Sequence, residues 1–312
     1  MANWYVTPNG AGAKTGVDWN NAAQGTGGTT LRTFFNANVA AADTMYMLSG
    51  TYATSFFDPN TPAGTAQGGP KPHIMGVSDE ALTPAVGDAR PLVVAQYGWY
   101  LPNTVDVSNL RFTSNQAQMF TAGAYSTITN VKCTSGNMAE EYCMYGSGNV
   151  LFFNCEASIA NGWCFVNGAF IGCFAHDCKY GFRQAGIIVN CVVKNCSNYG
   201  FNMGYAGIVA NNTFYNCVYG LYGLISIWTV VNNIFHSCTH AIYGQSLQGR
   251  TNTQFKGNIF YNNGSNVTNG PFVVLDSTNQ VNVDPKLVDP VNNDFSLQAD
   301  SPAKNTGWGY EL

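Results

Sequence analysis

Apolar and small residues recur along the middle of the chain with a period of about 20 residues. Residues 190–196, 211–217 and 232–238 repeat one order of polar and apolar positions. Aligned on the second position of each unit, the repeats give a column of anchor residues: Leu110, Val131, Cys155, Cys173, Cys191, Asn212, Asn233 and Asn258. Successive anchors are 21, 24, 18, 18, 21, 21 and 25 residues apart. A period this short fits one coil of a β-solenoid and is too short for a repeat of two helices.

Further columns share this register. Two positions after the anchors stand Phe112, Cys133, Ala157, Ala175, Val193, Phe214, Phe235 and Phe260. The position between these two columns is mixed: Arg111, Lys132, Glu156, Phe174, Val192, Thr213, Ile234 and Ile259. A third column holds Cys178, Cys196, Cys217, Cys238 and Asn263, and a fourth holds Cys143, Cys164, Phe182, Phe201, Leu221 and Ile242. Because side chains alternate between the two faces of a strand, the flanking columns are expected to point inward and the mixed column outward.

The pattern predicts an all-β fold, a right-handed parallel β-helix of roughly eight to eleven coils stacked about 4.8 Å apart. A left-handed solenoid needs a strict hexapeptide pattern, and the unequal coils argue against it. One continuous domain is expected, because the stability of a solenoid accumulates from coil to coil. Its parts are residues 1–43 as N-terminal strand and capping helix, 44–275 as β-helix with a Pro/Gly-rich insertion at 56–91, and 276–312 as C-terminal cap.

The ends of the solenoid and the insertion have patterns of their own. Apolar residues at 31, 34, 35, 39 and 42 lie on one face of a helix predicted over 30–42. This helix is expected to cover the open first coil, whose unpaired edge would otherwise pair with other chains. The insertion holds half of the 12 prolines. We expect it to shape a groove or to contact a neighbouring subunit, with a passive loop as the alternative.

Ten cysteines raise the question of disulfides, a metal site or a redox switch. Most of them fall in the inward columns, where stacked side chains run parallel instead of converging on a tetrahedral metal. Free cysteine also packs well as a small apolar residue. Reduced thiols and no metal are therefore expected. The asparagines that take over the anchor column at 212, 233 and 258 are expected to form a hydrogen-bonded ladder between coils, a structural role.

Both ends of the chain resemble a known group. Residues 4–10, the predicted helix and residues 49–52 resemble the opening of the pectate-lyase-like right-handed β-helix superfamily, and residues 284–290, 293–298 and 301–303 resemble its closing segment. The resemblance covers nearly the whole chain and implies the fold. It leaves the activity open, because the superfamily includes lyases, glycosidases, epimerases, phage spikes and noncatalytic proteins. Its lyases use Lys or Arg as base, while calcium or another basic residue neutralises the substrate carboxylate.

Charge and hydropathy narrow the choice of partner. With 13 Lys plus Arg against 17 Asp plus Glu, the net charge is −4, so no basic surface for nucleic acid is expected. The first residues show neither a basic nor an apolar signal region, and no run of about 18 apolar residues could cross a membrane. From this we expect a protein that is made in a cytoplasm and contacts no membrane.

One group of charged residues is a candidate catalytic zone. Its members on neighbouring coils are Glu140, Glu141, Glu156, His176, Asp177, Lys179, Arg183 and Lys194. His176 and Lys194 stand three positions after their anchors and should be stacked neighbours, so acids, a base and cations could together bind and cleave an anionic sugar. In the alternative, Arg111, Lys132 and Glu156 form ordinary surface ion pairs along their column. Lys194→Ala is expected to abolish cleavage with little change in melting temperature.

A second candidate surface is aromatic. Tyr215, Tyr261 and His236 share one outward column and are the candidate ligand-binding residues. Further tyrosines are expected in nearby turns, at 199, 205, 219, 222 and 243. Aromatic rings with polar tips suit both neutral sugars and protein interfaces, with ordinary packing of turns as the alternative.

These observations predict a virion-associated β-helix protein, a phage capsid decoration or tail-surface protein that attaches to other virion proteins and binds host glycans. The alternative is a polysaccharide lyase or glycoside hydrolase acting on an extracellular polysaccharide. A homo-oligomer is expected, with a trimer favoured. The expected location is the virion, or otherwise the extracellular space. No cofactor is expected, and calcium is the one ion that the resemblance leaves open.

Overall fold

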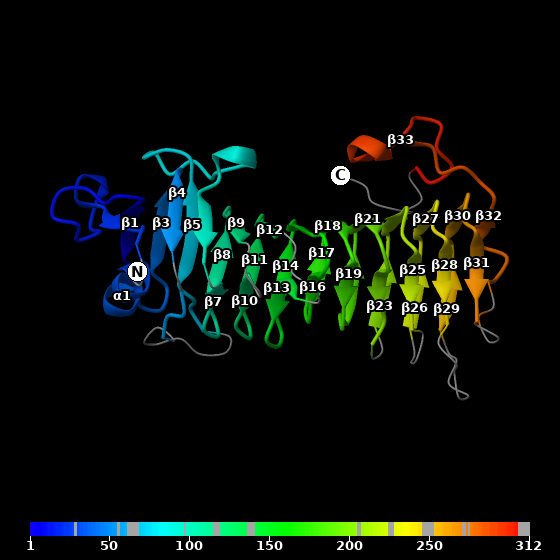
Figure 1. Cartoon of the computed structure of the whole chain (residues 1–312), viewed down its shortest axis with the longest axis horizontal. Helices are drawn as coiled ribbons and strands as arrows, with labels where there is room; N and C mark the ends of the chain where they lie inside the picture. Colours follow the sequence, from blue (N-terminus) through cyan, green and yellow to red (C-terminus); the bar gives the residue numbers. More distant parts are fainter. Residues whose placement is uncertain are drawn as a thin grey trace. The chain divides into compact units, whose positions relative to one another are not determined.

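The computed structural model describes residues 1–27, 30–54, 57–60, 69–96, 98–114, 119–135, 141–204, 207–223, 228–244, 253–269, 273 and 275–304. The chain is a parallel β-solenoid of the right-handed type with about 11 turns (Figure 1). Each turn contributes short strands to three parallel sheets, here called sheets A, B and C. The chain divides into two compact units, Met1–Ala157 and Ser158–Leu312.

The first unit contains these strands, given in the order in which they pair. Sheet A runs β2 (Ala23–Gln24), β1 (Asn3–Thr7), β3 (Thr44–Leu48), β5 (His73–Val77), β8 (Asp106–Ser108), β11 (Thr127–Thr129) and β14 (Leu151–Phe153). Sheet B runs β4 (Thr51–Thr54), β6 (Leu92–Ala95), β9 (Arg111–Ser114), β12 (Lys132–Ser135) and β15, which begins here (Glu156–Ile159). Sheet C runs β7 (Trp99–Tyr100), β10 (Phe120–Ala122) and β13 (Tyr142–Gly146). The helices are α1 (Thr30–Asn38) and the short 3-10 helices η1 (Trp19–Asn21) and η2 (Gly87–Ala89).

The second unit continues the same three-sheet pattern. Sheet A holds β17 (Ala169–Ile171), β20 (Ile187–Val189), β23 (Gly207–Ala210), β26 (Trp228–Val231) and β29 (Gln254–Lys256). Sheet B holds β18 (Phe174–Cys178), β21 (Val192–Cys196), β24 (Thr213–Tyr215), β27 (Ile234–His236), β30 (Ile259–Tyr261) and β32 (Gln280–Val281). Sheet C holds β16 (Trp163–Val166), β19 (Tyr180–Arg183), β22 (Tyr199–Asn202), β25 (Tyr219–Tyr222), β28 (His240–Tyr243) and β31 (Ser265–Thr268). A hairpin of β33 (Leu287–Asp289) and β34 (Asp294–Leu297), joined by η3 (Pro290–Asn292), follows.

Asparagine sets the turn from sheet A to sheet B. Asn109, Asn130, Asn154, Asn190, Asn211 and Asn232, each the residue before an anchor, have φ between 51° and 57°. Gly172 and Gly257 take this place in two other coils, with φ of 64° and 61°. Asparagine and glycine tolerate the left-handed region better than other residues. The repeated asparagine in the sequence therefore marks a backbone turn.

The inward columns are confirmed, except that Phe165 and not Cys164 pairs in register with Phe182 in the fourth column. All ten cysteines are buried, and Cys178 and Cys196 lie with their sulfur atoms 3.2 Å apart. Burial raises the pKa of both thiols well above its ordinary value. A thiolate would be poorly solvated there, so these groups stay protonated and pack as apolar residues.

The asparagine ladder is also confirmed. Nδ2 of Asn212 donates to Oδ1 of Asn233 at 2.9 Å, Asn233 donates in the same way to Asn258 at 3.0 Å, and Asn258 donates to Asn279 at 2.9 Å. Each of the first three also donates to a backbone carbonyl oxygen, as Asn212 does to Ile188 at 3.0 Å. These three side chains are fully buried, and buried amides are stable only when they are hydrogen-bonded in this way.

The N-terminal part differs from the expectation in two details. The helix α1 ends at Asn38, and Ala42 has a positive φ of 67°, which no helix continues through. Leu31 and Phe35 form its buried face, and its role as a cap stays a prediction. The predicted insertion at 56–91 contains β5, which pairs with β3 and β8, so part of this range belongs to a coil. Residues 56 and 61–68 of the insertion lie outside the described part of the chain.

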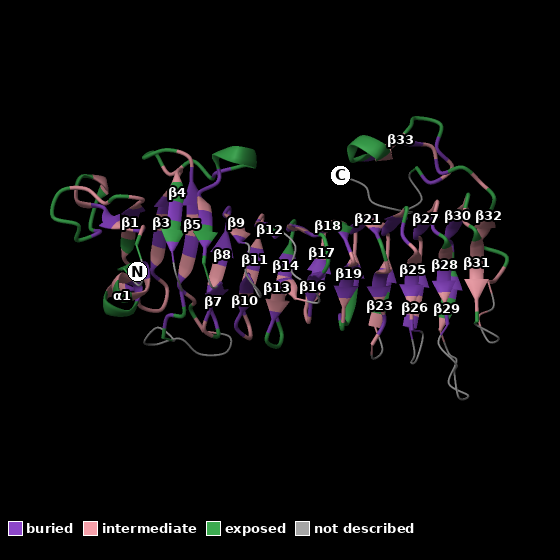
Figure 2. Cartoon of the chain, viewed as in Figure 1, coloured by how far each residue is buried: buried purple, intermediate pink, exposed green. Residues whose placement is uncertain are grey.

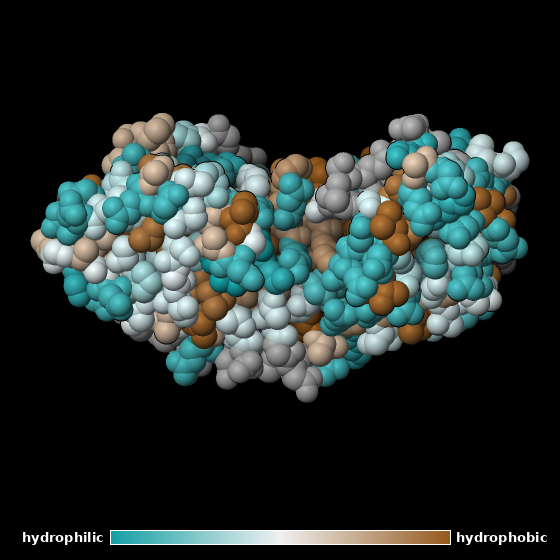
Figure 3. Space-filling model, turned by 90° about the horizontal axis from the view of Figure 1, so that it is seen from above, coloured by the Kyte–Doolittle hydropathy of each residue, from teal (hydrophilic) through white to brown (hydrophobic). Residues whose placement is uncertain are grey.

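The C-terminal segment, residues 283–304, lies against the outer face of sheet B in the second unit (Figure 2). Leu287, Phe295 and Ala303 pack on the outward side chains of Val192, Ile234 and Ile259. Figure 3 looks onto the segment from above, and its own outer surface is mostly hydrophilic with isolated apolar residues. We expected a cap at the end of the solenoid, whereas the described residues of this segment cover one side of it. The outward column is apolar on these coils because a second, smaller core forms there.

Candidate functional site

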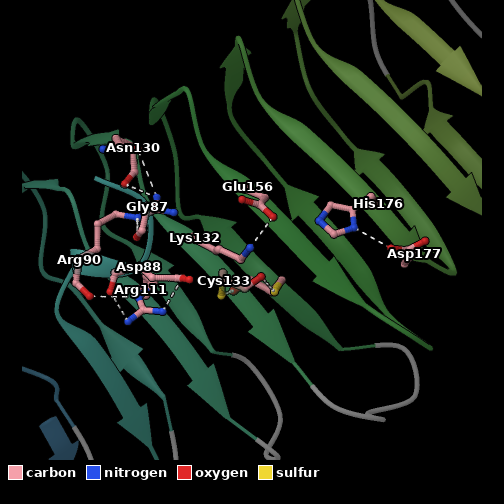
Figure 4. Close-up of polar contacts among 11 residues, drawn as sticks. Gly87, Asp88, Arg90, Arg111, Asn130, Lys132, Cys133, Glu156, His176 and Asp177 are labelled. Atoms are coloured by element: carbon pink, nitrogen blue, oxygen red, sulfur yellow. Dashed lines mark hydrogen bonds and ion pairs between the residues drawn. The ribbon is translucent and has the colours of Figure 1, made fainter. Parts of the chain in front are cut away.

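Paired charges occupy the outer face of sheet B in the first unit. Nζ of Lys132 lies 2.7 Å from Oε1 of Glu156, and Nη1 of Arg111 lies 2.9 Å from Oδ1 of Asp88 (Figure 4). Nε of Arg111 also donates to the backbone carbonyl oxygen of Arg90 at 3.0 Å. The predicted ion pairing along this column is thus present for Lys132 and Glu156. Such a partly exposed pair contributes little to stability, about 0 to 1 kcal/mol.

His176 and Asp177 form a hydrogen-bonded pair at the end of β18 in the second unit. Nδ1 of His176 lies 2.8 Å from Oδ2 of Asp177 (Figure 4). Nδ2 of Asn195 donates to Oδ1 of the same carboxylate at 2.8 Å. Burial opposes ionisation of Asp177, but the hydrogen bonds from His176 and Asn195 outweigh it and lower the pKa below its ordinary value. A carboxylate that orients an imidazole is the arrangement of a general base.

Lys194 is buried, with 6% of its surface exposed. It pairs in register with His176 on the neighbouring strand, as expected. Its ammonium, however, donates to the backbone carbonyl oxygen of Val291 at 2.6 Å and to Oδ1 of Asn293 at 2.5 Å. Lys194 therefore holds the C-terminal segment on sheet B, a role that the sequence did not suggest.

Lys179 and Arg183 lie apart from sheet B, against the aromatic residues of sheet C. Nζ of Lys179 lies 4.9 Å from the ring centre of Tyr180, and the guanidinium carbon of Arg183 lies 5.1 Å from the ring centre of Trp163. Both are cation–π distances. The structure thus divides the predicted catalytic zone between two sheets. Glu140 lies outside the described residues, and Glu141, which precedes β13, is partly buried.

Tyr215, His236 and Tyr261 lie in one column along sheet B, as predicted. The ring of His236 lies 5.2 Å from that of Tyr215 and 5.1 Å from that of Tyr261. Tyr215 and Tyr261 pack against the core beneath the C-terminal segment, and the ring of Tyr215 contacts Phe295 at 5.9 Å. Because the C-terminal segment covers part of this column, less of its surface is accessible to a ligand.

The most extensive aromatic surface lies on the outer face of sheet C in the second unit. We call it the aromatic strip, and it consists of Trp163, Tyr180, Tyr199, Tyr219, Tyr222, His240 and Tyr243. Trp163 and Tyr180 are only 6% and 9% exposed, whereas the other five are partly exposed. Adjacent ring centres are 4.0 Å apart for Trp163 and Tyr180, 5.2 Å for Tyr180 and Tyr199, and 5.2 Å for Tyr219 and His240. A second column places Tyr222 and Tyr243 5.3 Å apart, and Tyr199 joins the columns through Tyr222 at 4.0 Å.

The strip was missed in part, because four of its tyrosines were expected in turns and Tyr180, Trp163 and His240 were not considered. The sequence holds a signal for it, the dipeptide Tyr-Gly at 180–181, 199–200 and 219–220. Glycine is required there, since a Cβ on Gly181 would lie 2.3 Å from the carbonyl oxygen of Gly200. Tyr205, another predicted residue, lies outside the described part of the chain.

Burial, followed by the hydrogen bond with Tyr222, raises the pKa of Tyr199 to about 12. Its hydroxyl group is therefore protonated at neutral pH and remains a hydrogen-bond donor. Among the described residues, no three His, Cys, Asp or Glu side chains are grouped so that they could hold a metal ion. No helix in the described ranges is long and apolar enough to cross a membrane.

Comparison with known proteins identifies the fold. No family model and no curated protein sequence matches the chain. Pectate lyase Pel9A superposes with a TM-score of 0.61 and 16% identity, covering 97% of this chain and 90% of that one. ORF18 of Geobacillus virus E2 gives a TM-score of 0.39 at 12% identity, over 84% of this chain and 61% of that one. The PL6 family polysaccharide lyase Pedsa3628 from Pseudopedobacter saltans gives a TM-score of 0.26 at 11% identity, over 90% of this chain and 98% of that one.

The chain thus has the pectate-lyase-like parallel β-helix fold, as the resemblance implied. At 16% identity the superposition with Pel9A shows the fold alone. The two lower TM-scores support no conclusion about function.

Proposed function

We propose that this protein binds a polysaccharide along the aromatic strip and acts as a noncatalytic, virion-associated surface protein. The observation that carries the proposal is the strip itself, in which five partly exposed aromatic side chains continue two buried ones in adjoining columns on one face of sheet C. Aromatic rings with polar tips offer apolar edges and faces together with hydrogen-bonding groups. A sugar has the same combination of apolar C–H faces and hydroxyl groups.

The residues beside the strip support this use. Arg183 and Asn202 pair in register and continue the column of Tyr222 and Tyr243, so they add hydrogen-bond donors to the aromatic surface. Each coil contributes one residue to this column, so a polymer of repeating sugars can contact several coils at once. Weak contacts repeated along a chain add up to useful affinity.

The test is affinity electrophoresis of the purified protein through gels that contain neutral or acidic polysaccharides. Tyr222→Ser and Tyr199→Ser should weaken binding to the retarding polysaccharide by about tenfold, equivalent to about 1.4 kcal/mol. Tyr46→Ser is the matched control, because Tyr46 stacks on Tyr5 at 5.7 Å within sheet A of the first unit. Unchanged retardation of both strip variants, or equal loss in the control, would remove the strip as the binding surface.

The virion location and the partners belong to the same proposal and have their own test. We propose a homo-oligomer that attaches to other virion proteins. Purified particles that contain the protein in fixed stoichiometry to a structural protein would support this. Absence of the protein from the particles would leave glycan binding standing and remove the virion role.

A second candidate function is cleavage of a polysaccharide, favoured by the His176 and Asp177 pair. The carboxylate fixes the imidazole, as in a general base, although only 13% of the His176 side chain is exposed. Unsaturated products or new reducing ends, formed by the wild type and lost in His176→Gln, would establish an enzyme. That result would replace the noncatalytic proposal.

A further inference from the structure

The outer face of sheet A in the second unit is a continuous apolar surface. Its outward positions on β17, β20, β23 and β26 are Ala169, Ile171, Ile187, Val189, Ile208, Ala210, Thr229 and Val231. We call them the sheet A stripe. Ile187 and Ile208 are 41% and 44% exposed, among the most exposed large apolar side chains of the strands. None of these four strands contains a charged residue.

Sheet B of the second unit also has an apolar outer column, and the chain itself covers it. One of its two outward columns on the same coils is largely apolar, and Ile234 and Ile259 in this column are 0% exposed because the C-terminal segment lies over them. On sheet A, no segment within the described ranges covers Ile187 or Ile208. One chain thus contains two apolar sheet faces, of which it covers one itself.

We propose that the sheet A stripe is the centre of an interface with a second copy of this chain. The stripe is periodic, since Ile187 pairs in register with Ile208, and Val189 with Ala210 and then Val231. Strands in a sheet are about 4.8 Å apart, so the branched side chains form ridges with that repeat. A surface with the same repeat interdigitates best with these ridges, and an identical stripe on another copy has it.

The size of the stripe fits the centre of such an interface, and residues around the stripe must supply the rest. Four strands about 4.8 Å apart and about four residues long at 3.3 Å each give a face on the order of 250 Å². A specific interface buries about 800 Å² on each partner, with an apolar centre and a polar rim. Asn190, Asn211 and Asn232 follow the stripe along one edge and can form such a rim. The stripe itself carries no cation of the kind that nucleic acid or an acidic glycan would require, and Lys256, which pairs in register with Val231 on β29, marks its end.

The oligomeric state tests the proposal. Sedimentation equilibrium of the wild type should show self-association, and Ile208→Lys should raise the dissociation constant by at least about thirtyfold, since it buries an unpaired charge at the centre. The matched control is Val86→Lys, because Val86 is 66% exposed and lies beside η2 in the first unit. A monomeric wild type, or equal dissociation in the control, overturns the proposal.

Cross-linking gives a second measurement that does not depend on a disruptive charge. Because all ten native cysteines are buried, Ile208→Cys adds an accessible thiol to an otherwise unreactive surface. A bismaleimide that spans about 10 Å, the separation of packed sheets, should join two copies of this variant. Cross-linked dimers in Ile208→Cys but not in Val86→Cys support the interface. No cross-linking in either variant, or equal cross-linking in both, overturns it.

Discussion

The ammonium of Lys194 lies 2.6 Å from the backbone carbonyl oxygen of Val291, so a lysine on the solenoid holds the segment that covers it. The sequence placed this lysine among the candidate catalytic cations. Its burial and its second bond, to Asn293, make it an anchor of the C-terminal segment. The expectation of an almost unchanged melting temperature on its removal therefore no longer holds.

Lys194→Met should lower the free energy of unfolding by about 2 to 4 kcal/mol, because two charge-assisted hydrogen bonds are lost and their acceptors remain near the core. Urea unfolding measures this loss, and limited proteolysis should cut within residues 283–304 sooner than in the wild type. Lys132→Met is the control, since the pair with Glu156 is partly exposed and worth less than about 1 kcal/mol. Equal stability of the two variants would contradict an anchoring role.

Asn233→Leu should destabilise the fold by about 2 to 5 kcal/mol. Asn212 loses the acceptor of its side-chain amide and Asn258 loses a donor, and each buried unsatisfied group costs about 1 to 3 kcal/mol. Asn216→Gly is the control, because Asn216 is an exposed turn residue with φ of 52° that glycine accommodates. Thermal melting of both variants measures the contrast, and a wild-type melting temperature for Asn233→Leu would show that the ladder is dispensable.

Cys173→Asp should prevent folding, whereas Cys173→Ala should remain folded with a loss of roughly 1 kcal/mol. Cys173 is fully buried, and a carboxylate there would have no partner for its charge. The yield of soluble protein and its circular dichroism report the outcome. A soluble aspartate variant that unfolds cooperatively would mean that this column does not face the interior.

Stability should fall as the pH drops from 7 to 5, partly because of His236. Burial lowers the pKa of His236 below its ordinary value of 6.5, although Asp284 opposes the effect. The unfolded chain therefore takes up a proton at higher pH than the folded chain does. The contribution of His236 to stability is therefore fully present above the pKa that this residue has in the unfolded chain, and it is lost as the pH falls below that value.

His236→Gln tests this dependence through urea unfolding at several pH values. The variant should show a flatter decline between pH 7 and 5 than the wild type. Some decline should remain, because burial also lowers the pKa of His73. An identical slope in the variant and the wild type would show that His236 does not contribute.

Much of the fold could be predicted from the sequence, because each coil repeats the same local constraints. Inward residues such as Cys191 and Phe214 recur at fixed positions, and the residue before each anchor must adopt a left-handed turn. The end of α1 and the strand β5 were harder to predict. They depend on Ala42 and on pairing across an insertion, which have no counterpart in the repeat.

The candidate site could be predicted less well. Residues in one column were expected to meet, and His176 and Lys194 do pair in register. The role of Lys194 depended on a segment almost 100 residues further along the chain, as the 97-residue separation of Lys194 and Val291 shows. The aromatic strip had a local signal in its Tyr-Gly pairs, which becomes informative only when the packing of neighbouring glycines is known.

The sequence by itself determined the coil, its period and its inward face, because the strand alternation and turn preferences that specify them act within a single repeat. Only the tertiary structure decided which outward faces remain open. The apolar outward residues of sheets A and B look alike in sequence, yet the C-terminal segment covers Ile234 and leaves Ile208 exposed. That difference arises from contacts between distant parts of the chain, whose location no local preference specifies.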